Sequence, residues 1–259
     1  MKKLLVKSLN SLRLYSPAKA MKDQMTGAAS RERHWQRRMV EFYSLFIKEG
    51  DLCFDIGANV GRFTRVFLKR GARVICIEPQ EKCLRQLRKL FINNRNVIIV
   101  GKAVGEYEGY GELMISEEHT ISTMSDKWTK EGRFSKEHKW TKTQEVPVTT
   151  LDALIQSYGF PKFVKIDVEG FEEAVIRGLP SPVSFISFEF TREFFDDTKK
   201  CISRLLSIGD VKLNCTLYES AKLLFPEWVT AEEIYKKIDS LEDKLLWGDV
   251  FAKFNVPNK

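Results

Sequence analysis

The sequence contains none of the cysteine pairs that hold a zinc ion or build a disulfide framework. Its five cysteines form no CxxC motif, and three of them lie in or beside apolar runs. Thiols placed in this way are typical of proteins from a reducing compartment. We therefore expect a cytoplasmic protein without structural zinc or disulfide bonds.

Long apolar runs are also missing. No run reaches the eighteen or so residues needed to span a bilayer. The first fifteen residues begin with lysines, but Lys7, Ser8, Asn10 and Arg13 interrupt the apolar residues, and no small-residue cleavage site follows. We expect neither a transmembrane helix nor a signal peptide. Repeats and low-complexity tracts are absent, and 43% apolar content suffices for one α/β domain with additions.

Positive charge is concentrated near the start of the chain. The net charge is +7, and residues 1–48 contain eleven lysines and arginines against three acidic residues, so the remainder is close to neutral. Leu5, Leu9 and Leu12 share one helical face. We predict a basic, helical extension over residues 1–48, followed by one domain over 49–259. The extension is either a solvated leader helix or an arm that binds an anionic surface, such as a membrane periphery, or a partner protein.

From residue 50 onward, strand-like and helix-like segments alternate, which predicts a mostly parallel sheet covered by helices. A polar insert, residues 117–142, interrupts the order and is either a lid over a site or a mobile surface loop. The last predicted helix has Ile234, Ile238, Leu241 and Leu245 on one face. Strands are predicted at 51–56, 72–78, 96–100, 109–116, 143–150, 162–167, 184–190, 211–217 and 247–254.

The stretch "DLCFDIGANVGRF" (51–63) is typical of a turn between a buried strand and a helix that receives a ligand. Its pattern D-x-G-x-x-x-G differs from the dinucleotide fingerprint G-x-G-x-x-G, because Asp55 precedes the glycines Gly57 and Gly61. Asp55 suits a ligand ammonium, and the turn suits a carboxylate. Glu78 ends the second strand, where an acid accepts ribose hydroxyls. Together they favour S-adenosylmethionine over a purely structural turn.

Three more acids follow the fourth and fifth strands of the expected sheet. Asp167 and Glu169 come after the fourth strand and Glu189 lies at the fifth, so all three should meet Lys165 near a transferred methyl group. We predict these four as catalytic residues, with Asp167 as base or acceptor-orienting group. The alternatives are a helix cap, a first-turn acid and an ion pair, or a divalent-cation site, which we do not expect. His119 is a further candidate base.

These residues carry a resemblance to a known family. The segments "FDIGANVGRFT", "VICIEP", "GKAVGE", "VPVTTLDAL", "FVKIDVEGFEEAVIRG" and "ISFEF" come in the order seen in FkbM-type S-adenosylmethionine-dependent methyltransferases and cover about residues 50–190. The resemblance implies a Rossmann-like, doubly wound sheet of seven strands and O-methylation of sugars or other small hydroxylated molecules. It also implies which residues bind the cofactor: Asp55, Gly57, Asn59 and Gly61 at the methionine end, Glu78 at the ribose, and Lys102 and Ala103 at the adenine.

One departure from the family pattern concerns the adenine. The stretch "GKAVG" after the third strand has no acid to hold the adenine amine, so backbone contacts would have to serve. Two other functions agree with parts of the sequence, an RNA methyltransferase and a non-catalytic scaffold. A basic arm suits an RNA methyltransferase, but the chain has neither [DN]-P-P-[YF] nor Pro-Cys, so we do not expect a nucleic-acid substrate. A non-catalytic scaffold would leave three clustered acids unused. We therefore predict a methyltransferase for a small-molecule or glycan hydroxyl.

Overall fold

The structure is a computed structural model that describes residues 27–117 and 119–256. The chain divides between Phe42 and Tyr43 into two compact units. In the first unit the structure describes the helix α3 (Ala28–Tyr43), whose last residue begins the second unit. The predicted apolar face of Leu5, Leu9 and Leu12 lies outside the described residues. No helix of the described ranges is both long and apolar enough to cross a bilayer.

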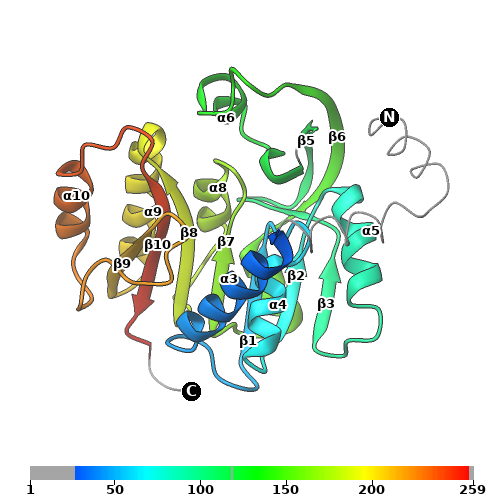
Figure 1. Ribbon diagram of the computed structural model, residues 1–259, viewed down its shortest axis with the longest axis horizontal. Helices are drawn as coiled ribbons and strands as arrows, with labels where there is room; N and C mark the ends of the chain where they lie inside the picture. Colours follow the sequence, from blue (N-terminus) through cyan, green and yellow to red (C-terminus); the bar gives the residue numbers. More distant parts are fainter. Residues whose placement is uncertain (1–26, 118, 257–259) are drawn as a thin grey trace. The chain divides into compact units, whose positions relative to one another are not determined.

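The second unit contains the predicted mostly parallel sheet of seven strands. The strand order is β3-β2-β1-β7-β8-β10-β9, and β10 is antiparallel to both of its neighbours (Figure 1). This topology confirms the doubly wound fold expected from the sequence. The strands are β1 (Leu52–Ile56), β2 (Arg73–Ile77), β3 (Val97–Val100), β7 (Phe163–Ile166), β8 (Phe185–Thr191), β9 (Val211–Leu217) and β10 (Trp247–Phe254).

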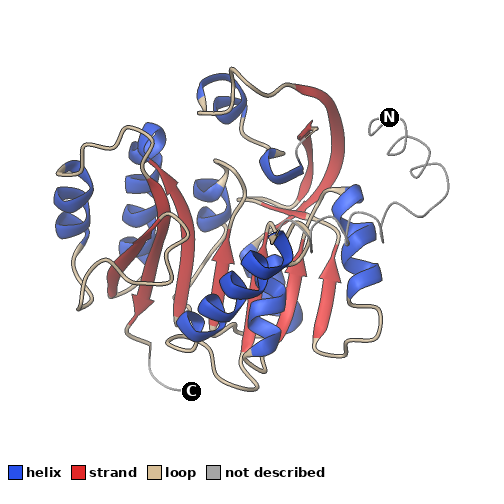
Figure 2. Ribbon diagram, in the orientation of Figure 1, coloured by secondary structure: helices blue, strands red, loops and turns tan. Residues whose placement is uncertain are grey.

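Helices cover both faces of this sheet (Figure 2). In β7, Val164 and Ile166 belong to the large core formed with α7 (Leu151–Tyr158), α8 (Glu172–Arg177), α9 (Phe195–Ile208) and α10 (Ala231–Asp239). Phe163 alternates to the opposite face, where its ring lies 5.8 Å from that of Phe67 in α4 (Arg62–Lys69). The helix α5 (Glu81–Leu90) packs near Cys76 of β2. Strict alternation therefore gives each central strand two buried faces.

A second, three-stranded sheet lies beyond the carboxyl ends of the parallel strands (Figure 1). Its order is β4-β6-β5, formed by β4 (Ala103–Val104), β6 (Trp140–Thr149) and β5 (Gly109–Ser116). The predicted polar insert contains a short 3₁₀ helix (His119–Ile121), α6 (Asp126–Glu131) and the first residues of β6. Ser125 caps α6 by accepting a hydrogen bond from the backbone N–H of Trp128. The insert is thus a folded element.

The predicted helix ending near Leu245 is shorter than expected. A capping box between Thr230 and Glu233 begins α10, and the helix ends at Asp239. Ile234 and Ile238 are fully buried, but Leu245 is 63% exposed in the loop that leads to β10. The helical spacing of Leu245 was coincidental, because the chain must turn here to enter the sheet between β8 and β9.

Candidate active site

The turn after β1 alternates residues with left-handed backbone conformation. Gly57 and Gly61 both have φ of +76°, and Asn59 has φ of +50°. A Cβ on Gly57 would lie 1.8 Å from the carbonyl oxygen of Asp167, so only glycine fits where the turns after β1 and β7 meet. The backbone N–H groups of Gly57 and Ala58 both donate to the carbonyl oxygen of Ile77 at 3.0 Å. The turn is therefore fixed against both neighbouring strands.

Glu78 is held at the end of β2 by two backbone groups. Its Oε2 accepts a hydrogen bond from the N–H of Asn59 at 2.8 Å, and its Oε1 accepts one from the N–H of Gln80 at 2.7 Å. The residue is only 6% exposed. Burial raises the pKa of its carboxyl to about 7, although the two hydrogen bonds act to lower it. Each oxygen keeps a lone pair for a further donor.

Asp55 lies at the end of β1 and is 1% exposed. Its Oδ2 accepts a hydrogen bond of 2.5 Å from the hydroxyl of Thr64 in α4. Burial raises the pKa of Asp55 to about 6, opposed by Thr64 and by the charge of Lys165. The carboxyl is thus anchored to the helix that follows the glycine turn.

These elements surround a cavity of about 320 Å³, here called the first cavity. Six of the seven sequence-predicted cofactor residues line it, namely Asp55, Gly57, Asn59, Glu78, Lys102 and Ala103. Gly61 does not line the cavity; it begins α4 and faces Leu87 and Phe91 of the α5 region. The catalytic candidates Asp167, Glu169 and Glu189 line the cavity as well, whereas Lys165 does not.

Three carboxylates converge at one end of the first cavity. Asp167, Glu169 and Glu189 each offer an oxygen within 4.8 Å of the others. Burial raises the pKa of Glu169 well above its usual value, and the charges of Asp167 and Glu172 raise it further. Burial and the charges of Glu169 and Asp167 raise the pKa of Glu189 in the same way. Burial therefore favours the neutral form of Glu169 and Glu189, and the hard oxygen ligands of the cluster also suit a divalent cation.

Lys165 lies beneath this cluster on β7 and is 2% exposed. Its Nζ donates to Asp167 Oδ2 at 3.1 Å and to Asp249 Oδ1 at 3.4 Å, and it lies 4.4 Å from the centre of the Phe63 ring. Burial lowers the pKa of Lys165, but the two carboxylates outweigh that effect and raise it well above its usual value. Lys165 is thus a buried cation that orients Asp167 from below.

Several residues of this site were missed by the sequence analysis. Asp249 follows Trp247 in β10, and Glu219, just after β9, accepts a hydrogen bond of 2.6 Å from Arg62. Glu219, Trp247 and Arg62 line the first cavity. These residues belong to no sequence motif. The alternation of side chains along β10 is the one signal that could have placed Asp249 on the same face of the sheet as Lys165. The sequence could have indicated Gln80 as a site residue, because it lies two residues beyond Glu78.

The insert is attached over the cavity by charged and polar contacts. The Nε and Nη2 of Arg133 donate to the two oxygens of Glu193, each at 2.6 Å, and the same guanidinium donates to the carbonyl oxygens of Leu245 and Leu246. The hydroxyl of Thr123 donates to the carbonyl oxygen of Glu169 at 2.6 Å. The insert therefore covers the carboxylate cluster in this structure.

A comparison with known proteins adds a family match. The model of the methyltransferase FkbM domain matches residues 55–211. No curated protein sequence matches the chain.

The solved structures that are similar to this chain share little sequence identity with it. A precorrin-6y C5,15-methyltransferase from Geobacter metallireducens is 14% identical over 84% of this chain and 87% of that chain, with a TM-score of 0.43. A TehB-like SAM-dependent methyltransferase from Corynebacterium glutamicum is 12% identical over 90% of this chain and 99% of that chain, with a TM-score of 0.43. Fibrillarin from Aeropyrum pernix, solved with S-adenosyl-L-methionine, is 12% identical over 80% and 68%, with a TM-score of 0.37.

Proposed function

The chain belongs to the FkbM methyltransferase family, and from this premise we propose that it transfers a methyl group from S-adenosylmethionine to a hydroxyl of a small molecule, sugar or glycan. The observation that carries the proposal is the first cavity, which is lined by a glycine turn, a fixed acid at the end of β2 and three catalytic candidates. Its volume lies within the range of ligand sites.

The residues present fit the methyl donor. Glu78 has two lone pairs left for ribose hydroxyls and is already oriented by the N–H groups of Asn59 and Gln80. The turn from Gly57 to Val60 lines the cavity, and Asp55 offers a carboxyl for an ammonium. The donor supplies an electrophilic methyl group bound to a sulfonium.

The chain's own residues would then handle the acceptor. Asp167, paired with Lys165, would accept a hydrogen bond and finally the proton from the attacking hydroxyl. Glu169 and Glu189, whose pKa values are raised by burial, would form hydrogen bonds with the acceptor beside Asp167. The insert would exclude water while the acceptor is aligned. The alternative is that Asp167, Glu169 and Glu189 bind a divalent cation in place of forming hydrogen bonds with the acceptor.

The described cysteines agree with a cytoplasmic location. All five are free and buried. Burial raises the pKa of each thiol well above its usual value, for example to about 12 for Cys83 and Cys215. Free, protonated and buried thiols support the proposal of a reducing compartment.

Calorimetric titration with S-adenosylmethionine tests the donor site. We expect Glu78→Gln to weaken binding about tenfold or more, because an amide both loses the charge-assisted bond to a ribose hydroxyl and opposes one of the two backbone donors. The matched control is Glu81→Gln, three residues further on, whose side chain is 48% exposed and forms ion pairs with Arg85 and Arg88 of its own helix. The absence of binding to the unaltered protein would end the proposal.

The acceptor class is tested by methyl uptake. Labelled S-adenosylmethionine is incubated with sugars, lipids and RNA, using the whole chain and a variant that begins at residue 43. We expect uptake into a hydroxylated small molecule or glycan that does not need the extension. Uptake into RNA that depends on the extension would favour the nucleic-acid alternative.

A further inference from the structure

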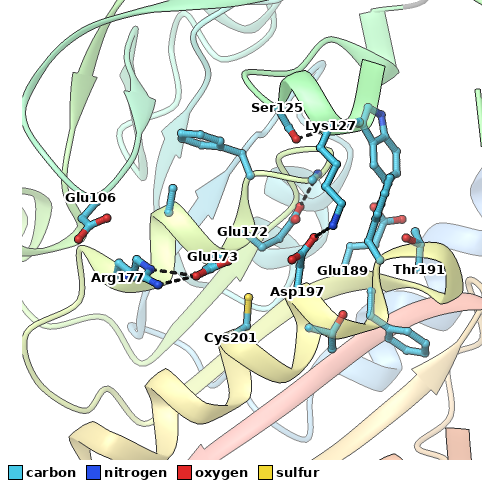
Figure 3. Close-up of a pocket in the computed structure, with 17 residues that line it drawn as sticks. Glu106, Ser125, Lys127, Glu172, Glu173, Arg177, Glu189, Thr191, Asp197 and Cys201 are labelled. Atoms are coloured by element: carbon cyan, nitrogen blue, oxygen red, sulfur yellow. Dashed lines mark hydrogen bonds and ion pairs between the residues drawn. The ribbon is translucent and has the colours of Figure 1, made fainter. Parts of the chain in front are cut away.

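A second and a third cavity accompany the first. The second cavity, of about 310 Å³, shares Glu189 and Phe171 with the first and therefore belongs to the site already described. Charged groups on its wall form ion pairs with one another: Figure 3 shows Lys127 bonded to Asp197, with 2.5 Å between Nζ and Oδ2. The third cavity differs from it in position and in charge.

The third cavity, of about 380 Å³, lies at the other edge of the seven-stranded sheet. Its walls come from the start of β7, β8 and β9 and from the end of β10, which runs antiparallel to its two neighbours (Figure 1). The first cavity lies at the carboxyl ends of β1, β2 and β7, and the two cavities have no lining residue in common among the described residues. A ligand in the third cavity would therefore be separate from the methyl donor and the acceptor.

Strand pairing places two lysines side by side in the third cavity. Lys253 of β10 lies directly opposite Lys212 of β9, and on its other side it lies opposite Phe185 of β8. Residues that are opposite each other in neighbouring strands project from the same face of the sheet, and like charges at such positions destabilise the strand pair. Lys162, which directly precedes β7, is the third lysine of the wall.

Two aromatic rings hold lysine side chains at the cavity. The Nζ of Lys253 lies 5.7 Å from the centre of the Trp228 ring, and the Nζ of Lys162 lies 5.5 Å from the centre of the Phe185 ring. The centres of the two rings are 6.1 Å apart. The face of a ring attracts an ammonium group but does not cancel its charge, so both lysines stay available to an anion.

The acids around the third cavity do not balance its lysines. Among the described residues that line it, Asp210 is the one acid, so three lysines leave the wall with a net charge of +2. None of the three forms a salt bridge within residues 27–117 and 119–256. The charge of Glu233 in α10 also reaches Lys212, but its Oε2 already accepts hydrogen bonds from the N–H and the hydroxyl of Thr230.

We propose that the third cavity binds a phosphate monoester through Lys162, Lys212 and Lys253. A lysine ammonium binds phosphate as a point charge with three donors. A phosphate monoester carries about two negative charges at neutral pH and presents three terminal oxygens, which matches the net charge of the wall and the number of lysines. A carboxylate supplies one charge and two oxygens, and it would leave part of the positive charge unbalanced.

The third cavity has room for more than the phosphate group. Its volume lies in the range of small-molecule sites, and Phe185 and Trp228 offer apolar surface beside the lysines for the organic part of the ligand. A soluble phosphorylated metabolite and a phosphatidic acid headgroup both present this chemistry, and vesicle binding distinguishes the two sources.

The indole N–H signal of Trp228 reports on the third cavity and is identified in the NMR spectrum by its loss in Trp228→Phe. The full-length protein is titrated at constant ionic strength with a pool of ribose 5-phosphate, glucose 6-phosphate and glycerol 3-phosphate, and separately with ribose and with acetate. We expect the phosphate esters to shift the Trp228 signal and the other two probes to leave it in place. A signal that no ester moves, or that acetate moves equally, overturns the proposal.

Lys212→Gln supplies the second arm, because it removes one charge and keeps most of the side chain. Since Lys212 opposes another lysine, we expect an unchanged or higher melting temperature without ligand, an unchanged dissociation constant for S-adenosylmethionine and a response to the esters weakened about tenfold. The matched control is Lys89→Gln, an exposed lysine of α5 that lines none of the three cavities, and it should keep the response. Equal responses in Lys212→Gln and the unaltered protein would refute the assignment.

Vesicles of phosphatidylcholine with phosphatidic acid identify the source of the phosphate. Sedimentation with these vesicles that falls in Lys212→Gln but not in Lys89→Gln assigns the phosphate to a lipid headgroup. Equal sedimentation of the three proteins, together with a Trp228 signal that the esters shift, assigns it to a soluble ester.

Discussion

The substitution Lys165→Met removes a buried cation and leaves its two carboxylate partners in place. Methionine fills a similar volume, so the change creates no large cavity. Lys165 is 2% exposed, and its Nζ lies 3.1 Å from Asp167 and 3.4 Å from Asp249. The variant therefore isolates the electrostatic role of the lysine.

The expected cost follows from the burial of each partner. Removing one member of a buried ion pair costs about 3–5 kcal/mol of unfolding free energy, because the remaining charge stays without a partner. The carboxylate side chains of Asp167 and Asp249 are 34% and 19% exposed, so water recovers part of that loss. We expect the lower end, about 3 kcal/mol, which is about 1 M in the urea midpoint for a slope of about 3 kcal/mol per M.

Urea denaturation of four proteins measures this cost: the unaltered chain, Lys165→Met, Asp249→Asn and the double variant. Asp249→Asn should destabilise the unaltered chain but recover about 1–2 kcal/mol in the Lys165→Met background, because it removes one of the unpaired charges. The deficit of Lys165→Met should also be smaller at pH 5 than at pH 8, since a carboxyl without its cation gains a proton more easily. A total cost below about 1 kcal/mol, or equal effects of Asp249→Asn in both backgrounds, would refute the reasoning.

Three further outcomes follow from the same geometry. Gly57→Ala should lower the free energy of unfolding by more than about 3 kcal/mol in urea denaturation, because its Cβ would overlap the carbonyl oxygen of Asp167. It should also abolish binding of S-adenosylmethionine in calorimetry, and normal binding would contradict the contact between the turns after β1 and β7. Glu189→Gln should gain stability relative to the unaltered protein between pH 5 and 8. A carboxyl with a raised pKa stabilises the fold below its unfolded pKa of about 4.5 and loses that contribution as pH rises, so a constant difference would count against a raised pKa of Glu189. Arg133→Gln should lower the unfolding free energy by about 1–2 kcal/mol and make the insert easier to cleave in limited proteolysis, because its paired bonds to Glu193 are lost; an unchanged cleavage rate would show that other contacts hold the insert.

The sheet was largely predictable because its strands are buried on both faces. The run "ARVICIE" has five apolar residues among seven and "SFISFEF" has four among seven, and turn residues bound them. Strands β5, β9 and β10 begin and end where the sequence placed them. In contrast, the two-residue strand β4 is too short for any period to show. Strands β5 and β6 were predicted, but their sequences do not indicate that they pair with each other in a separate sheet.

The site residues also divide into those that the sequence predicted and those that it did not. Asp55, Glu78 and Asp167 end parallel strands, and the ends of such strands share one edge of the sheet, so local sequence was enough to bring them together. Asp249 enters the site from an antiparallel strand, and Glu219 reaches it from the segment after β9, where it accepts a hydrogen bond from Arg62. Both properties depend on packing between distant segments, which a single sequence does not display.

The position of β10 has a consequence for the order of assembly. This strand pairs with β8 on one side and β9 on the other, so β9 joins the sheet only through the last strand of the chain. Asp249 enters with it, and before that moment Lys165 has only one of its two anionic partners. A chain still being synthesised therefore presents an open edge at β8 and an incomplete site, and a premature stop before Trp247 would remove both the strand that closes the sheet and the carboxylate that completes the charge balance.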